Sequence, residues 1–392
     1  MTTAEASPLT GVWADLVGQE QAVEVLRRAV GSGNYAMTHA WLITGPPGSG
    51  RSNAARAFAA ALQCDQQGCG QCQACVTALS GAHPDVTLVR TEQLSIGVKE
   101  VRELVRRAAM SPVLGRWQVI VVEDADRVTD QGADALLKSV EEPAPGTVWL
   151  LCAPTADDVS VTIRSRCRTL NLTTPRTSAV TGLLIERGID PELADEAARA
   201  AQGHIGRANR LARDAEARER RRQILKIPGR LSRGLPECLA AADELVKATA
   251  EEAKQQTEAL DADERAELEK ALGFGTKGAR PKQAAAALKE LTEQQAARAK
   301  RLQRDALDRA LTELTTWYRD VLSIQLGSGA GLINTMDAEL TAMAEASSAA
   351  DTLHRVDALL ECRTMLETNV APLLAVERLM IALARPGMAG NP

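Results

Sequence analysis

A short apolar run followed directly by a glycine-rich loop constrains the fold of this chain more than any other feature. Residues 41–44 (Trp-Leu-Ile-Thr) are typical of a strand buried inside a parallel sheet. They lead into residues 45–52 (Gly-Pro-Pro-Gly-Ser-Gly-Arg-Ser) and then into an alanine-rich helical stretch at 53–63. Glycines let backbone N–H groups converge on phosphate oxygens, and the N-terminus of the following helix favours negative charge. Together these segments predict a phosphate-binding loop.

The candidate cofactor-binding residues of this loop are Gly45, Gly48, Gly50, Arg51 and Ser52. Arg51 stands where the phosphate-loop pattern has a lysine, and a planar guanidinium does not replace a compact ammonium. Ser52 retains the hydroxyl group that would hold Mg²⁺. Two interpretations stay open: a nucleotide site, and a relic loop that keeps the fold but binds nothing.

A second apolar run, residues 117–122, ends in the acidic pair Glu123 and Asp124. ATPases place a Mg²⁺ ligand and a water-activating carboxylate at the end of such a strand. The usual order is aspartate and then glutamate, so the reversed order displaces each carboxylate by one methylene group. A misplacement of about 1 Å can lower a rate by about 100-fold. The altered loop and the altered acidic pair both predict a degenerate ATP site, and whether ATP and Mg²⁺ bind there stays open.

Further apolar runs at 86–89, 148–152 and 169–172 alternate with helical stretches such as 134–142. Alternating strands and helices predict a parallel sheet that is covered on both faces. The second half changes character: short helices are expected over 175–214, and long amphipathic helices over 237–270 and 283–326, with a break at 273–282. His39, His83 and His204 lack a paired nucleophile or carboxylate, so we expect packing or turn roles for them.

Composition and charge narrow the class of protein. Of 392 residues, 45% are hydrophobic and only 2% aromatic, which favours helix-rich domains over an aromatic-rich β-sandwich. No apolar run approaches the roughly 20 residues that cross a bilayer, and the first residues lack the segments of a secretory signal. We therefore expect a cytoplasmic protein with no membrane partner. The net charge of −5 argues against a generally basic DNA-binding surface.

Four of the eight cysteines form a C-x4-C-x2-C-x2-C cluster: Cys64, Cys69, Cys72 and Cys75. A reducing compartment disfavours disulfides, and the two C-x2-C steps allow successive thiolates to bind one ion. Four thiolates suit a closed, structural zinc site. The cluster does not have the common ferredoxin spacings of an iron–sulfur site, and free thiols are the remaining interpretation.

Several segments together resemble bacterial clamp-loader subunits of the AAA+ superfamily. In chain order they are residues 39–48, 64–75, 83–85 (His-Pro-Asp), 133–143 and 165–167 (Ser-Arg-Cys). The resemblance is strong over residues 12–215 and weak near the C-terminus. It implies an α/β P-loop AAA+ domain with a parallel sheet, followed by an all-α lid and an all-α C-terminal collar domain. Residues 13–19 also resemble a segment that lies near the adenine in such ATPases, and core packing of Trp13 explains them equally well.

On this basis we expect three domains. Residues 1–174 would form the AAA+ P-loop-type domain with a zinc knuckle at 64–75, and residues 175–228 the helical lid. Residues 229–392 would form a helical collar, or oligomerisation domain, with a long helical insertion around 240–310. Opposite charges at helical spacing predict solvent-facing helices in the insertion, which is interpreted either as a partner arm or as a solvated extension.

The family contains motor subunits (tau/gamma) with an intact lysine loop and stator-like delta-prime subunits that tolerate a decayed ATP site, and the chain resembles the second type. The resemblance implies a subunit of the DNA polymerase III holoenzyme that is not a catalyst alone. It would join motor and delta subunits in a hetero-pentamer, which loads the sliding clamp onto primer-template DNA. Arg166 would act as an arginine finger in trans on a neighbour's ATP, an effect typically worth about 10³–10⁵ in rate.

The residues themselves support a role for Arg166 only in part. Arg164, Arg166 and Arg168 alternate with Ser165 and Cys167, so an extended segment would put all three arginines on one face. An ordinary charged strand end is the other interpretation.

Two other functions stay open at this stage. One is an active AAA+ motor subunit of the same complex, against which the altered ATP-site residues weigh. The other is a zinc module that binds nucleic acid directly, against which the acidic charge and the scarcity of aromatic residues weigh.

Overall fold

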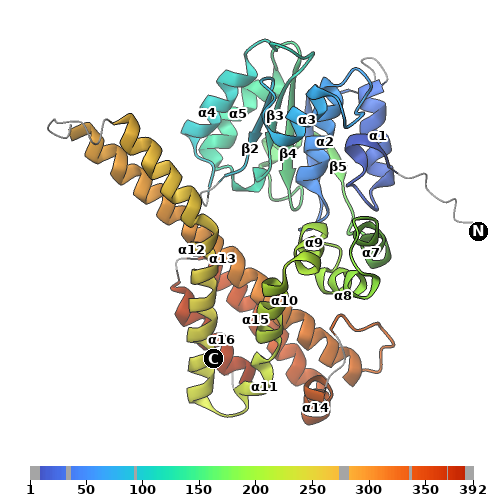
Figure 1. The fold of residues 1–392 in the computed structure, drawn as a ribbon, viewed down its shortest axis with the longest axis vertical. Helices are drawn as coiled ribbons and strands as arrows, with labels where there is room; N and C mark the ends of the chain where they lie inside the picture. The colour runs from blue at the N-terminus through green and yellow to red at the C-terminus, as the bar shows by residue number, and fades with distance from the viewer. Residues whose placement is uncertain are drawn as a thin grey trace, which may run out of the picture. The chain divides into compact units, whose positions relative to one another are not determined.

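The computed structural model describes residues 9–31, 37–91, 95–272, 282–334, 338–368 and 370–384. It divides into two compact units, Met1–Arg213 and Asp214–Pro392, which are described separately (Figure 1). Of the residues that we expected to form a lid, 175–213 group with the sheet in the first unit and 214–228 belong to the second unit. The finer division at 174 and 228 stays a prediction.

The first unit is built on a five-stranded parallel sheet with the order β2-β3-β4-β1-β5. The strands are β1 Ala40–Thr44, β2 Val86–Val89, β3 Gln118–Val122, β4 Thr147–Ala153 and β5 Arg168–Asn171. All five were predicted from short apolar runs, and the prediction of a parallel sheet is confirmed. Because all strands point the same way, the segments after β1, β3 and β4 leave the sheet at one edge.

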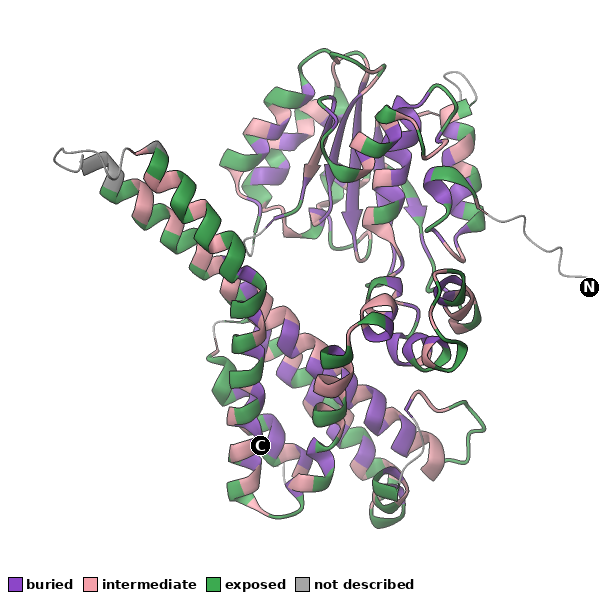
Figure 2. Cartoon of the chain, in the orientation of Figure 1, coloured by how far each residue is buried: buried purple, intermediate pink, exposed green. Residues whose placement is uncertain are grey.

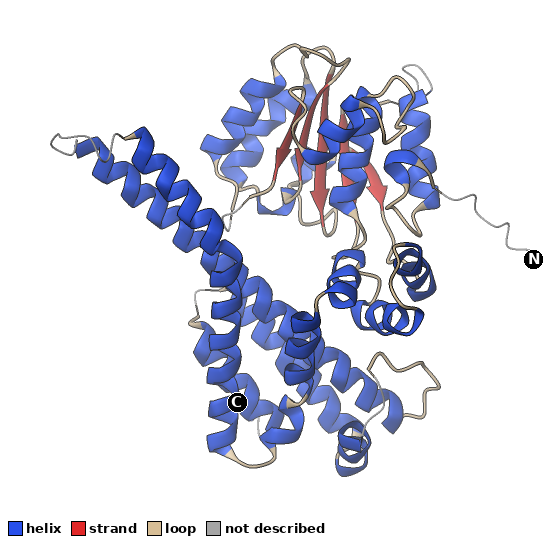
Figure 3. Cartoon of the chain, viewed as in Figure 1, coloured by secondary structure: helices blue, strands red, loops and turns tan. Residues whose placement is uncertain are grey.

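Helices cover both faces of this sheet, as expected (Figure 3). Those of the α/β part are α1 Glu20–Gly31, α2 Arg51–Gln63, α3 Gln73–Ser80, α4 Val98–Ala108, α5 Asp130–Glu141 and the short α6 Val161–Arg164. Alternate strand residues enter different layers: Trp41 and Ile43 pack with α2, whereas Leu42 packs with the α4 and α5 side. This alternation is the period-two pattern of a strand that is buried on both faces.

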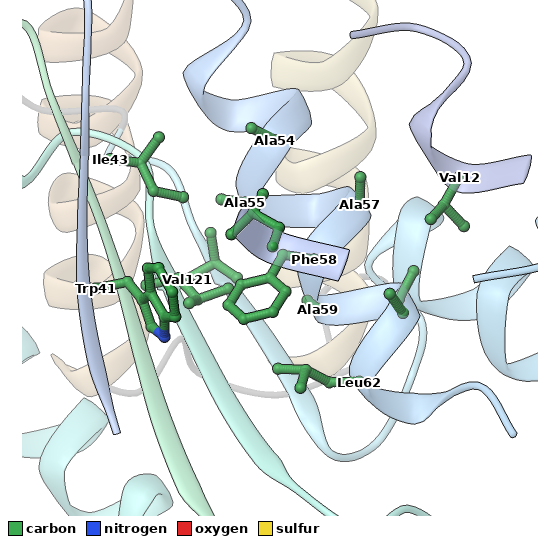
Figure 4. Packing of buried hydrophobic residues seen from close by; sticks show 14 of the residues in the cluster. Val12, Trp41, Ile43, Ala54, Ala55, Ala57, Phe58, Ala59, Leu62 and Val121 are labelled. Atoms are coloured by element: carbon green, nitrogen blue, oxygen red, sulfur yellow. The ribbon is translucent and has the colours of Figure 1, made fainter. Parts of the chain in front are cut away.

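Alanines set the distance between α2 and the sheet. Ala54, Ala55 and Ala59 are fully buried, and Figure 4 shows them beside Phe58 against the strands. Phe58 meets Trp41 edge-to-face, with ring centroids 5.2 Å apart. Small side chains allow this close approach, and one aromatic pair fills the remaining space.

The segment around Arg166 differs from the prediction of an extended stretch. α6 continues as a helical turn, in which the Ser165 N–H donates to the Val161 carbonyl and the Arg166 N–H to the Ile163 carbonyl, both at 3.0 Å. β5 begins only at Arg168. A helical turn rotates successive side chains by about 100°, so the three arginines do not alternate onto one face.

Three further helices complete the first unit, and seven form the described part of the second. The former are α7 Thr177–Glu186, α8 Pro191–Ala201 and α9 Ile205–Arg213. The latter are α10 Ala215–Leu225, α11 Ile227–Leu231, α12 Leu235–Ala271, α13 Lys282–Gln325, α14 Ala338–Ala346, α15 Ala349–Glu367 and α16 Pro372–Ala384. None of the described helices is long and apolar enough to cross a membrane.

The two long predicted helices are confirmed as α12 and α13, which pack against each other. Near the second unit's core they bury apolar residues such as Leu245 and Leu311. Farther along, the seam becomes polar: Arg298, 7% exposed, donates to both carboxylate oxygens of Glu264 at 2.7 and 2.9 Å. Figure 2 shows this distal part largely exposed. The predicted break, apart from its last residue, lies outside the described residues.

A buried carboxylate in the first unit supplies a test of the fold. Asp85, fully buried, accepts N–H groups of Val113, Leu114 and Gly115 at 2.6–2.8 Å and so fixes the loop between α4 and β3. Burial raises the pKa of Asp85, but the three N–H groups together lower it by more. The net pKa is therefore below the usual value. The stabilisation is therefore present at neutral pH and is lost as the pH falls through the native pKa.

We expect Asp85→Asn to lower the free energy of unfolding by about 2–4 kcal/mol at pH 7, because it removes the charge that three N–H groups face. The difference from the unmodified protein should shrink below about pH 4. Urea denaturation at several pH values measures it. Asp134→Asn, on the exposed face of α5, is the matched control and should change stability by less than about 0.5 kcal/mol. Equal stability of the two variants would contradict the assigned role of Asp85.

Candidate functional site

The glycine-rich loop connects β1 to α2 at the carboxyl edge of the sheet. Gly48 and Gly50 have φ angles of 84° and 93°, in the left-handed region where glycine carries no steric penalty. The Gly45 N–H donates to the Pro154 carbonyl at 3.1 Å, which ties the loop to the end of β4. Ser52 is half-buried in the first turn of α2.

Arg51 contacts the loop itself. Its Nη1 donates to the carbonyl oxygen of Gly45 at 2.5 Å, so part of the guanidinium is committed to the chain's own backbone. The Ser49 hydroxyl is buried and has no hydrogen-bond partner.

The first residue of the acidic pair is already bound to a cation. Glu123 is 8% exposed, and Arg56 of α2 approaches its Oε1 with Nε at 2.7 Å and Nη2 at 2.6 Å. A buried carboxylate needs such a partner. Asp124 follows as the residue that precedes the 3-10 turn Ala125–Arg127. A metal ion bound through Oε1 of Glu123 would have to displace Arg56.

His204, at the entrance to α9, lies against the loop. A Cβ atom added to Gly48 would lie 2.2 Å from Cγ of His204. The His204 Nδ1 accepts the N–H of Arg207 at 3.2 Å. Burial lowers the pKa of His204, and the charges of Arg207 and Arg51 lower it further, so the imidazole is neutral at pH 7. From the sequence we expected a packing role for His204. Its packing on the phosphate loop could not be predicted, because the contact joins segments more than 150 residues apart.

The structure brings the loop, Arg51, Glu123 and Asp124 into one region, and Arg56 and His204 lie there too. The charges of Glu123, Arg51 and Asp124 all act on the buried thiol of Cys152 on β4, whose pKa burial raises to about 12. This thiol stays protonated at neutral pH and is not a nucleophile there.

Arg166 lies outside this group and is 39% exposed. It pairs with Glu141 at the end of α5, and its Nη1 donates to the Thr162 carbonyl at 2.8 Å. Arg164 pairs with Asp157, and Arg168 lies 4.8 Å above the Trp41 ring. Exposed ion pairs of this kind are worth about 0–1 kcal/mol, so the Arg166 side chain is inexpensive to release.

The four clustered cysteines form a separate site. Their sulfur atoms all lie within 4.8 Å of one another, and Cys64 Sγ is 3.7 Å from both Cys69 Sγ and Cys72 Sγ. Four sulfurs at about 2.3 Å from a zinc ion in a tetrahedron are about 3.8 Å apart. Cys64 directly follows the last residue of α2, and Cys72 caps α3, where its Sγ accepts the Cys75 N–H at 3.4 Å. The geometry fits one closed four-thiolate metal site.

The electrostatics of the cluster also suit a cation. Burial raises the pKa of Cys64, but backbone N–H groups of Cys69, Gly68 and Gln66 lower it, and the net value is about 6. N–H groups of Gln71 and Cys72 lower the pKa of Cys69. Burial and the neighbouring sulfurs raise the pKa of Cys75. A divalent cation would relieve this repulsion and hold all four as thiolates.

The strand order and the glycine-rich loop between β1 and α2 define a parallel α/β domain of the kind that carries a phosphate-binding loop. The protein family described as "DNA polymerase III, delta subunit" matches residues 18–176. The DNA polymerase III subunit gamma/tau of Mycobacterium tuberculosis is 37% identical over 159 residues, which are 39% of this chain and 27% of that protein.

Two delta' subunits of DNA polymerase III match as well. That of Pseudomonas aeruginosa is 37% identical over 141 residues (34% of this chain, 43% of that protein). That of Bacillus subtilis is 30% identical over 194 residues (49% and 59%). The chain spans less than two thirds of each of these relatives. The N-terminal part of this chain is thus similar in sequence to delta' and gamma/tau subunits of bacterial DNA polymerase III.

We expect the purified protein to bind one zinc ion per chain and Cys69→Ser to lose it, because the remaining three thiolates leave the tetrahedron open. Metal analysis, and the sulfur-to-cobalt absorption of the Co²⁺-substituted protein, measure this. Cys238→Ser is the matched control, since Cys238 lies in the second unit. Full zinc content in the Cys69 variant, or none in the unmodified protein, would contradict the site.

Proposed function

We propose that this chain is a delta-prime-like subunit of a DNA polymerase III clamp loader, with a degenerate ATP site of its own and an arginine finger for a neighbouring ATPase subunit. The observation that carries the proposal is the contrast between its arginines. Arg51 and Arg56 are bound inside the chain's own site, whereas Arg166 is half-exposed and held by weak surface contacts.

We propose that the chain's own ATP site is degenerate for three physical reasons. Arg51 bonds the loop carbonyl of Gly45, Arg56 occupies the carboxylate where Mg²⁺ would bind, and His204 covers Gly48. Each must move before a triphosphate can bind, and binding would lose the free energy of these movements. ATP with Mg²⁺ is therefore not proposed as a resident cofactor, and zinc at the four cysteines is proposed as structural.

The proposed partners are those of a clamp loader: motor and delta subunits in a hetero-pentamer, and the sliding clamp and primer-template DNA through the complex. The second unit is proposed as the collar that joins the ring. Its exposed apolar side chains on α15 and α16, among them Leu353, Leu360 and Leu374, suit burial in an assembly. Such a subunit acts in the cytoplasm and contributes to polymerisation by loading the clamp.

The alternative is an active motor subunit of the gamma/tau type. The 37% identity to the gamma/tau subunit of M. tuberculosis favours it. Nucleotide binding and ATP turnover by the isolated chain distinguish the two.

We expect Arg166→Ala to lower ATP turnover at the adjoining site of a reconstituted loader by about 10³-fold or more, with clamp loading lost in parallel. The reason is that the variant would lose the guanidinium that stabilises the charge building up on the γ-phosphate. Arg164→Ala, two residues away and paired with Asp157, is the matched control and should keep most activity. Assembly is checked by size-exclusion chromatography. Unchanged turnover in an intact Arg166→Ala complex would refute the finger.

We expect restoring the lysine alone, Arg51→Lys, to raise the affinity for Mg²⁺-ATP by no more than about threefold. Arg56 and His204 still hold the site closed in that variant. The triple variant Arg51→Lys, Arg56→Ala, His204→Ala should bind at least about tenfold more tightly than the unmodified chain. Titration with a fluorescent ATP analogue measures both. Tight binding and turnover by the unmodified chain would instead support the motor subunit.

A further inference from the structure

The four-cysteine knuckle is in contact with the N-terminal segment 9–19, here called the N-terminal bridge. The Val12 N–H donates to the Gly68 carbonyl at 3.1 Å. A Cβ atom on Gly11 would lie 2.2 Å from that same oxygen, and one on Gly70 would lie 3.0 Å from the Gly11 carbonyl carbon. The two backbones thus meet with no room for a side chain, directly beside the ligand Cys69.

The bridge is a continuous hydrogen-bonded run that enters α1. The Leu16 N–H donates to the Trp13 carbonyl at 3.0 Å, the Gln19 N–H to Leu16 at 3.1 Å, and the Val23 N–H to Gln19 at 2.9 Å. Trp13 and Leu16 are each 2% exposed, so the run is anchored in the core. Figure 4 shows Val12 beside Ala57 of α2. A displacement of Gly11 would therefore be transmitted through buried, hydrogen-bonded residues to Gln19.

At its other end the bridge holds the phosphate loop and the segment that leaves the sheet. Gln19 is 4% exposed, and its Nε2 donates to the carbonyls of Ser49 at 3.1 Å and Thr173 at 2.6 Å. The Thr173 N–H donates to Gln19 Oε1 at 3.1 Å. Leu16 lies next to Gly50: a Cβ atom added to Gly50 would be 3.7 Å from Cδ2 of Leu16.

The bridge also reaches the helices beyond β5. Asp15 pairs with Arg187 at the end of α7. A Cβ atom on Gly18 would lie 3.3 Å from Cα of Pro175. One short segment thus contacts the knuckle, the phosphate loop and residues 173–175. These last residues lie between β5 and α7 and are here called the hinge.

We propose that the metal-bound knuckle is a positioning element, which fixes the phosphate loop and the hinge at 173–175 through the N-terminal bridge. The proposal rests on the proposed metal site but not on a clamp-loader function. It assigns the four cysteines an effect beyond the local stability of the knuckle. Gly11 couples the knuckle to the bridge, and Gln19 couples the bridge to the loop and the hinge.

The test is hydrogen–deuterium exchange of the full chain, with zinc content measured in parallel. We expect Gly11→Ala to keep its zinc while exchange rises at least about tenfold in residues 9–19, 44–50 and 173–175, but not in α4. Gly97→Ala is the matched control, because nothing lies within 4 Å of its added Cβ and its φ is not positive. Zinc removal by a chelator should give the same pattern, together with faster exchange in 64–81.

A second variant tests the direction of the coupling. Gln19→Leu should accelerate exchange at 44–50 and 173–175 and leave both the zinc content and residues 64–75 unchanged. Unchanged exchange at 44–50 in zinc-loaded Gly11→Ala would overturn the proposal, as would chelator effects confined to residues 64–81. If the unmodified protein bound no zinc, the metal site itself would be refuted. Exchange in the Gly11 and Gln19 variants would still show whether the bridge fixes residues 44–50 and 173–175.

Discussion

The packing of α2 against the sheet through alanine side chains is the constraint on which the candidate site depends. Ala54, Ala55 and Ala59 place small methyl groups beside the Phe58 ring between the helix and the strands. Interiors packed to this density transmit displacements rather than absorbing them. The loop before α2 and the knuckle after it are therefore held at the two ends of one rigid body. Neither end can move far without opening a void beneath the helix.

Electrostatics reinforce this rigidity inside the loop's own site. Glu123 is too buried to remain an isolated charge, and Arg56 neutralises it from α2 itself. Arg51 is turned onto the Gly45 carbonyl, and the neutral His204 ring packs on Gly48. Both cations thus have partners within the chain itself. The shape of the glycine-rich loop is held by these internal contacts.

Much of the first unit could be predicted because its signals are local. Each strand is a short apolar run, and the knuckle follows from the three spacings between four cysteines. The exceptions are long-range or depend on hydrogen bonding that no pattern reports. His204 reaches Gly48 only through tertiary packing, and the Arg56–Glu123 pair joins a helix to a strand end. The segment 164–167 alternates like a strand in sequence, but backbone bonds to Val161 and Ile163 continue the helical turn instead.

The different environments of the arginines bear on how one chain can lack an ATP site and still serve one. A cation used within its own domain gains from burial and fixed partners, as Arg56 does beside Glu123. A cation supplied to another subunit must be released at low cost, and the exposed pair of Arg166 with Glu141 meets that condition. A neighbour's triphosphate, shielded from water in an assembled interface, would attract Arg166 more strongly than one half-exposed glutamate. Loss of the chain's own chemistry and supply of an arginine in trans are therefore compatible within one fold.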